Sequence, residues 1–98
     1  MTIEKTLNGT ALTIAVAGRL DTMSAPELEA ELSSSLPAVD SLVMDLSKLD
    51  YISSAGLRVL LSAHKVMSAK GGMKVTNVNE IVQEVFDVTG FSDILYIG

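Results

Sequence analysis

The chain has 98 residues, a formal net charge of −5 at pH 7 and no cysteine. Its length suits one domain with a modest core, and an apolar share of 48% with only four aromatic residues indicates an aliphatic interior. The acidic balance argues against nucleic-acid binding, which needs a basic surface, and the lack of cysteine excludes disulfides and thiolate metal sites.

The N-terminal residues MTIEKTLNG lack the basic and apolar regions of a secretory signal. No apolar run reaches the roughly 18 residues that a membrane-spanning helix needs. We therefore expect a cytoplasmic protein that does not insert into membranes.

The chain is predicted to begin with a β-hairpin. Alternating apolar residues lie on both sides of Asn8-Gly9, most clearly at Leu12, Ile14 and Val16. An Asn-Gly pair suits a tight turn in which both central residues have positive φ. The sheet should therefore open with two antiparallel strands.

A helix is predicted to begin at Ser24, after a connection over residues 18–23. The segment SAPE at 24–27 has the pattern of a capping box, with proline in the first turn, where its missing amide costs nothing. One apolar stripe follows, formed by Leu28, Leu32 and Leu36. The acidic residues Glu27, Glu29 and Glu31 indicate a solvated helix face. Pro37 should end the helix.

The stretch from Ser41 to Lys70 forms the centre of the predicted fold. Residues 41–46 are an apolar run of the kind expected for a buried central strand, and a polar turn should follow. Ser53 is then the best candidate for a helix N-cap, because its hydroxyl can accept a hydrogen bond from a first-turn amide. Ser54 would be the first helical residue. At about 100° per residue it lies away from the leucines and should face water or a partner.

Three further elements complete the predicted fold. They are a strand over 73–78, a helix capped by Asn77 or Asn79, and a terminal piece over 94–97 that is either an edge strand or a packed tail. The buried side of this helix should comprise Ile81, Val82, Val85 and Phe86. The order of elements predicts an α/β fold: a mixed sheet of four to five strands, with an opening antiparallel hairpin and then parallel βαβ units, packed with three or more helices.

Four segments of the chain resemble the motifs of a known family. They are YISSAGL at 51–57, MDL at 44–46, GRLD at 18–21 and VTGF at 88–91. Over essentially its whole length, the chain is similar to bacterial anti-sigma factor antagonists, the single-domain form of the STAS domain. The resemblance implies one STAS domain over residues 1–98, without a cofactor, and is compatible with a monomer.

In that family, the serine two places before the helix glycine is phosphorylated by a partner serine/threonine kinase. This kinase has a histidine-kinase-like ATPase fold and is also the anti-sigma factor, and a serine phosphatase reverses the modification. Counting back from Gly56, the resemblance assigns the phosphorylated position to Ser54. It implies a partner-binding surface made of Asp21, Thr22, Ser53, Ser54, Ala55, Gly56 and Arg58.

Several of these residues also have a purely structural interpretation. Asp21 suits a turn or a helix cap, Gly56 suits close packing of the helix on the sheet, and Arg58 suits a solvated helix surface. His64, the only histidine, is interpreted as structural, because no second ligand or nucleophile accompanies it.

There are two alternatives to partner switching. Catalysis is not expected, because the chain has no phosphate-binding loop, no dinucleotide fingerprint and no histidine beside a serine. The other is a STAS module that is not phosphorylated and serves as a subunit of a lipid-transport or signalling scaffold complex. Members of the family often carry aspartate just before the phosphorylated serine, and the presence of Ser53 at that place leaves this alternative open.

Overall fold

The structure, a computed structural model, describes all 98 residues. Five strands form one sheet in the order β1-β2-β3-β4-β5. They are β1 (Thr2–Asn8), β2 (Ala11–Leu20), β3 (Ser41–Ile52), β4 (Met73–Thr76) and β5 (Tyr96–Ile97). β1 is antiparallel to β2, and every other neighbouring pair is parallel. The predicted hairpin followed by parallel units is confirmed.

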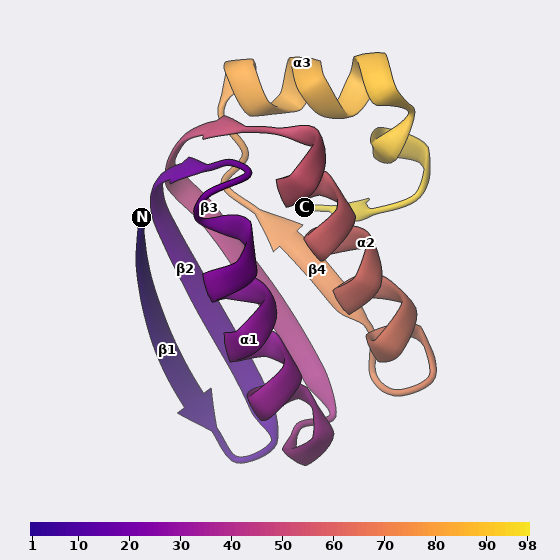
Figure 1. The fold of residues 1–98 in the computed structure, drawn as a ribbon. Helices are drawn as coiled ribbons and strands as arrows, with labels where there is room; N and C mark the ends of the chain where they lie inside the picture. The colour runs from indigo at the N-terminus through magenta and orange to yellow at the C-terminus, as the bar shows by residue number, and fades with distance from the viewer.

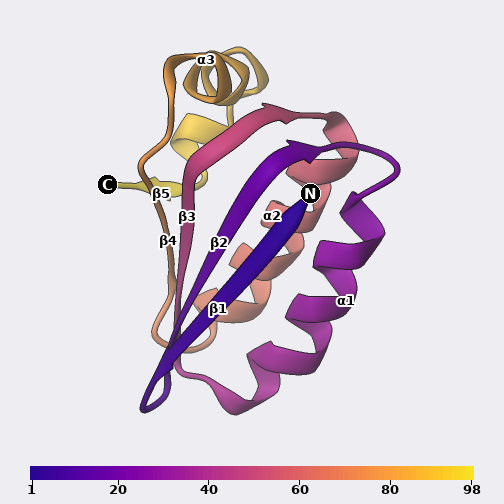
Figure 2. The same ribbon diagram turned by 90° about the vertical axis from the view of Figure 1, so that its left-hand side faces the viewer.

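Three helices connect the parallel strands: α1 (Ala25–Ser35), α2 (Ser54–Ser68) and α3 (Glu80–Thr89). The short 3-10 helices η1 (Leu36–Ala38) and η2 (Phe91–Asp93) follow α1 and α3. In Figure 1, α1 and α2 lie side by side, and α3 crosses the end of the sheet where β3 and β4 finish. Figure 2 shows α1 and α2 on the same face of the sheet. The starts of all three helices thus lie near the carboxyl ends of the parallel strands.

The aliphatic core fills the space between the sheet and the helices. Its fully buried members include Ile14 and Met44 from the sheet, Leu28 from α1, Leu60 from α2 and Phe86 from α3. No charged or polar residue is buried. The longest helix, α2, has 15 residues, and no helix combines the length and hydrophobicity required to span a bilayer.

Strand β3 is longer than the sequence predicted. The prediction of a polar turn after Leu46 is wrong. The strand continues to Ile52, and its pairing with β2 shifts register opposite residues 15–17 and 18–19. Each shift inserts an extra residue in β3, as a β-bulge does. Burial then changes from every second to every third residue, which keeps Leu46, Leu49 and Ile52 in the core. The strand therefore leads directly into α2.

The hairpin turn lies one residue later than predicted. Asn8 pairs with Ala11, so the loop residues are Gly9 and Thr10, of which only Gly9 has a positive φ, at 64°. Glycine takes that conformation without steric cost. The Asn-Gly signal therefore located the hairpin but not its central residues.

Asn79, rather than Asn77, is the N-cap of α3. Its side chain accepts a hydrogen bond from the amide of Val82 at 2.9 Å and donates to the carbonyl oxygen of Leu49 at 2.6 Å. Of the predicted buried side, Val82 and Phe86 are buried, but Ile81 is 63% exposed. The terminal piece is an edge strand, because residues 96–97 pair with β4.

Lys70 ties the end of α2 to the connection between α1 and β3. Its ammonium donates hydrogen bonds to the carbonyl oxygens of Leu36 at 2.7 Å and Val39 at 3.0 Å. The carbonyl oxygen of Leu36 also accepts from the amide of Val39 at 3.3 Å, and the ammonium adds a charged donor to this turn at the end of α1. The contact helps to set the spacing between α1 and α2.

Replacing Lys70 by methionine should lower the free energy of unfolding by about 1–3 kcal/mol, because the carbonyls of Leu36 and Val39 lose a charged donor. Urea denaturation measures this change. The matched control is Lys65→Met, since Lys65 is exposed and its ammonium has no partner in the chain. Equal free energies of unfolding for the two variants would contradict the assigned role of Lys70.

Candidate functional site

Two consecutive serines mark the start of α2. Ser53 is the N-cap, and its hydroxyl oxygen accepts a hydrogen bond from the amide of Gly56 at 3.4 Å. Ser54 is the first helical residue, is exposed, and its hydroxyl has no hydrogen-bond partner in the chain. Both local predictions for this pair are confirmed. The result is a free hydroxyl at the positive end of the α2 dipole.

The end of β2 holds the start of α2 in place. The amide of Ser53 donates to the carbonyl oxygen of Leu20 at 2.9 Å. Gly56 is buried against the same residue, and a Cβ atom there would lie 2.7 Å from Leu20 Cγ and 2.9 Å from Ile52 Cγ1. Glycine therefore allows α2 to approach the sheet closely. This agrees with the structural interpretation of Gly56, close packing of the helix on the sheet.

Asp21 organises the turn between β2 and α1. Its Oδ1 accepts hydrogen bonds from the amides of Met23 at 3.0 Å and Ser24 at 3.1 Å. These hydrogen bonds, chiefly the one from the Ser24 amide, hold the pKa of the Asp21 carboxyl below its usual range. Their effect on the pKa outweighs the opposing effect of desolvation. The side chain is therefore ionised at neutral pH and acts as a turn aspartate.

The capping box predicted at 24–27 is wrong. Ser24 Oγ donates to the carbonyl oxygen of Arg19 at 2.7 Å and accepts from the amide of Asp21 at 2.9 Å. It makes no hydrogen bond to a helix amide, and Ser24 itself has helical backbone angles. The preceding turn thus uses the hydroxyl that the capping box required.

A cleft of about 270 Å³ lies between the starts of α1 and α2. Three of the predicted partner-binding residues, Thr22, Ala55 and Arg58, line it together. Thr22 and Arg58 are exposed, Ala55 is half-buried, and Arg58 forms no ion pair in the chain. The other four do not line this cleft: Asp21, Ser54 and Gly56 are next to lining residues in sequence, and Ser53 is two residues from Ala55. The fold thus brings residues from two distant segments to one place.

An interaction between Arg19 and Tyr51, which was not predicted from the sequence, lies beside this site. The two residues are register partners in β2 and β3, and the Arg19 guanidinium carbon lies 4.3 Å from the centroid of the Tyr51 ring. Arg19 Nε also lies 3.7 Å from Asp21 Oδ2. The sequence predicted a strand only as far as Leu46, so it did not predict that Tyr51 pairs with Arg19. Met23, in the neighbouring turn, is also highly exposed, at 89%.

His64 is half-buried on α2, and no partner contacts its Nδ1 atom. No group of three or more histidine, cysteine, aspartate or glutamate residues is placed to hold a metal ion.

Replacing Gly56 by alanine should destabilise the fold by about 1–3 kcal/mol, because the added methyl group overpacks the contact with Leu20 and Ile52. At an open helical position the same change would stabilise by roughly 0.5–1 kcal/mol, so the sign of the effect is informative. Thermal and urea unfolding measure it, with Ser54→Ala in the same turn as a control that should remain near wild type. A Gly56→Ala variant as stable as wild type would contradict the close packing.

Comparisons with known proteins identify the family of this chain. The family model of the STAS domain matches residues 2–97. BtrV of Bordetella bronchiseptica, named as a proposed anti-sigma factor antagonist, is 39% identical over 83 residues, which cover 83% of this chain and 72% of BtrV. The anti-sigma-B factor antagonist of Bacillus subtilis strain 168 is 32% identical over 92 residues, which cover 93% of this chain and 84% of that protein.

The Bacillus protein SpoIIAA, an anti-sigma factor antagonist, shares the fold at lower identity. Its unphosphorylated form matches with a TM-score of 0.84 at 19% identity, over 99% of this chain and 88% of SpoIIAA. Its phosphorylated form matches with a TM-score of 0.77 at 18% identity, over 99% of this chain and 91% of SpoIIAA. The family model and the two relatives above show that the chain belongs to the STAS domain family, among the anti-sigma factor antagonists.

Proposed function

We propose that this chain is an anti-sigma factor antagonist controlled by phosphorylation of Ser54. The unphosphorylated chain binds an anti-sigma factor that is also a serine kinase with a histidine-kinase-like ATPase fold, and the sigma factor is released. Phosphorylation ends this binding, and a serine phosphatase restores it. The observation that carries the proposal is the exposed hydroxyl of Ser54, free of hydrogen bonds, at the first position of α2.

The start of α2 is suited to accept a phosphate without unfolding. A phosphoserine adds roughly −1.5 to −2 charges at pH 7, and the N-terminus of a helix favours negative charge. Arg58 lies one turn further along α2 and forms no ion pair that it would have to give up. SpoIIAA has been solved in both phosphorylation states, and both share the fold of this chain. These features support a modification that leaves the interior unchanged.

The effect of the phosphate would then fall on the complex. Like-charge contact and desolvation at an interface cost several kcal/mol, and each ~1.4 kcal/mol changes affinity tenfold. One phosphate at the centre of a docking surface is therefore sufficient to dissociate a tight complex. No conformational change within this chain is needed.

The presence of Ser53 where related antagonists often carry aspartate favours a second candidate function. In that alternative, the chain is not phosphorylated and serves as a subunit of a lipid-transport or signalling scaffold complex. Ser53 caps α2 through its hydroxyl, as an aspartate would through its carboxylate, so the difference leaves the helix start intact. The replacement of aspartate by Ser53 would instead affect how the kinase recognises this chain.

Co-expression with the histidine-kinase-like serine kinase from the same gene neighbourhood distinguishes the two candidates. Partner switching predicts a mass increase of about 80 Da, one phosphate, located at Ser54. The increase should disappear in Ser54→Ala and persist in Ser68→Ala, an exposed serine at the other end of α2. An unmodified chain in the presence of active kinase would support the scaffold alternative.

Replacing Ser54 by glutamate should weaken binding to the same kinase by more than about 100-fold, or ~2.8 kcal/mol. The melting temperature should change by less than about 2 °C, because the new carboxylate faces solvent at a helix N-terminus. Isothermal titration calorimetry and thermal unfolding measure the two quantities. Ser68→Glu, which adds the same charge at the far end of α2, should bind normally. Wild-type binding by Ser54→Glu would show that the switch is not at Ser54.

A further inference from the structure

The cleft beside Ser54 continues along the groove between α1 and α2. A second cleft of about 250 Å³ begins where the first ends, and Glu29, Val59 and Ser62 line both. The second cleft is otherwise lined mainly by apolar side chains from both helices, including Leu32, Leu36, Ala63 and Val66. One groove therefore runs from the proposed switch site to the last turn of α2.

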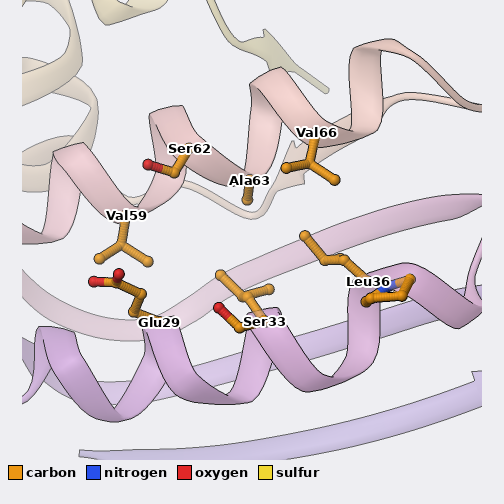
Figure 3. A pocket seen from close by; sticks show the side chains of 9 residues that line it. Glu29, Ser33, Leu36, Val59, Ser62, Ala63 and Val66 are labelled. Atoms are coloured by element: carbon orange, nitrogen blue, oxygen red, sulfur yellow. The ribbon is translucent and has the colours of Figure 1, made fainter.

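The walls of this groove have a regular arrangement. Figure 3 shows Val59, Ala63 and Val66 directed from α2 toward α1, at the i, i+4 and i+7 positions of one helical stripe. Glu29 of α1 and Leu36 of η1 lie on the opposite wall. Val59 and Ala63 are buried, at 5% and 2% exposed, whereas Val66 is 47% exposed and opens the last turn of the stripe to solvent. The apolar stripe of α2 is thus only partly covered within this chain.

We propose that this groove receives an amphipathic helix of the anti-sigma factor, with apolar residues packed between α1 and α2 and a basic residue paired with Glu29. The proposal rests on the proposed function, and it extends the docking surface from Ser54 along α2. A ridge of side chains spaced at i, i+4 and i+7 is the usual complement of a groove of this kind.

Two observations favour this occupant. The second cleft is smaller than the roughly 300–1,000 Å³ of pockets that enclose small ligands, so it suits inserted side chains. Glu29 is exposed and forms no ion pair, because the ion pairs of the chain are Lys5 with Glu31 and Arg19 with Asp21. A carboxylate without a partner on an apolar groove, in a chain of net charge −5, is complementary to a basic amphipathic helix.

The first test places a charge inside the groove, about three turns from Ser54. Val66→Glu should weaken binding to the histidine-kinase-like kinase at least tenfold by calorimetry, because the apolar ridge of the partner would face a carboxylate. Ser68→Glu is the matched control. It adds the same charge two residues later, about 200° around the helix, does not line the groove, and should bind within twofold of wild type.

The second test uses a substitution on the exposed surface of α1 that leaves the core untouched. Glu29→Lys should weaken binding about fivefold or more at low salt, and the loss should shrink as ionic strength rises. Glu27→Lys makes the same change two residues earlier, outside both clefts, and should bind within twofold of wild type. Far-UV circular dichroism and melting temperature confirm that each variant is folded.

The two proposals fail in different ways. If Val66→Glu and Glu29→Lys bind like their controls while Ser54→Glu does not bind, the groove is not part of the interface and the switch at Ser54 stands. If Val66→Glu does not fold, the comparison of Glu29→Lys with Glu27→Lys decides whether the groove is part of the interface. Wild-type binding by Ser54→Glu, with weak binding by the groove variants, would support the groove and overturn the switch.

Discussion

The contact between Leu20 and the first turn of α2 determines where Ser54 lies. The backbone of Leu20 binds the amide of Ser53, and its side chain occupies the space that any residue larger than glycine at position 56 would need. This contact joins the end of β2 to the helix that follows β3. It therefore also brings the turn at Asp21 and Thr22 next to Ala55 and Arg58. A helix start fixed in this way can change its surface charge without changing its position.

The two serines at the start of α2 have different roles. Ser53 satisfies a first-turn amide and so stabilises the helix, whereas the hydroxyl of Ser54 takes no part in the fold. Stability and modification therefore depend on different side chains. In the proposed groove the same separation holds, because α1 and α2 are anchored to the sheet by buried leucines, while Val66 on their facing stripe is exposed.

Local patterns in the sequence were sufficient to predict the hairpin, the helices and the N-cap at Ser53, because each depends on neighbouring residues. The features that escaped prediction depend on contacts between distant segments. Strand β3 extends to Ile52 because its bulges pair with β2, and Ser24 fails to cap α1 because its hydroxyl binds Arg19 and Asp21. The pairing of Arg19 with Tyr51 and the groove between α1 and α2 likewise need the register of strands and helices, which no single segment encodes.

The central claim is that a phosphate on Ser54 changes a docking surface and leaves the interior as it is. Comparison of ¹H–¹⁵N correlation spectra of the chain before and after phosphorylation at Ser54 tests it most directly. The account predicts that amide shifts change at the start of α2 and in the neighbouring turn at residues 21–24, with the amides of core residues such as Ile14 and Met44 unmoved. Widespread shifts across the sheet, or loss of signal dispersion, would contradict it.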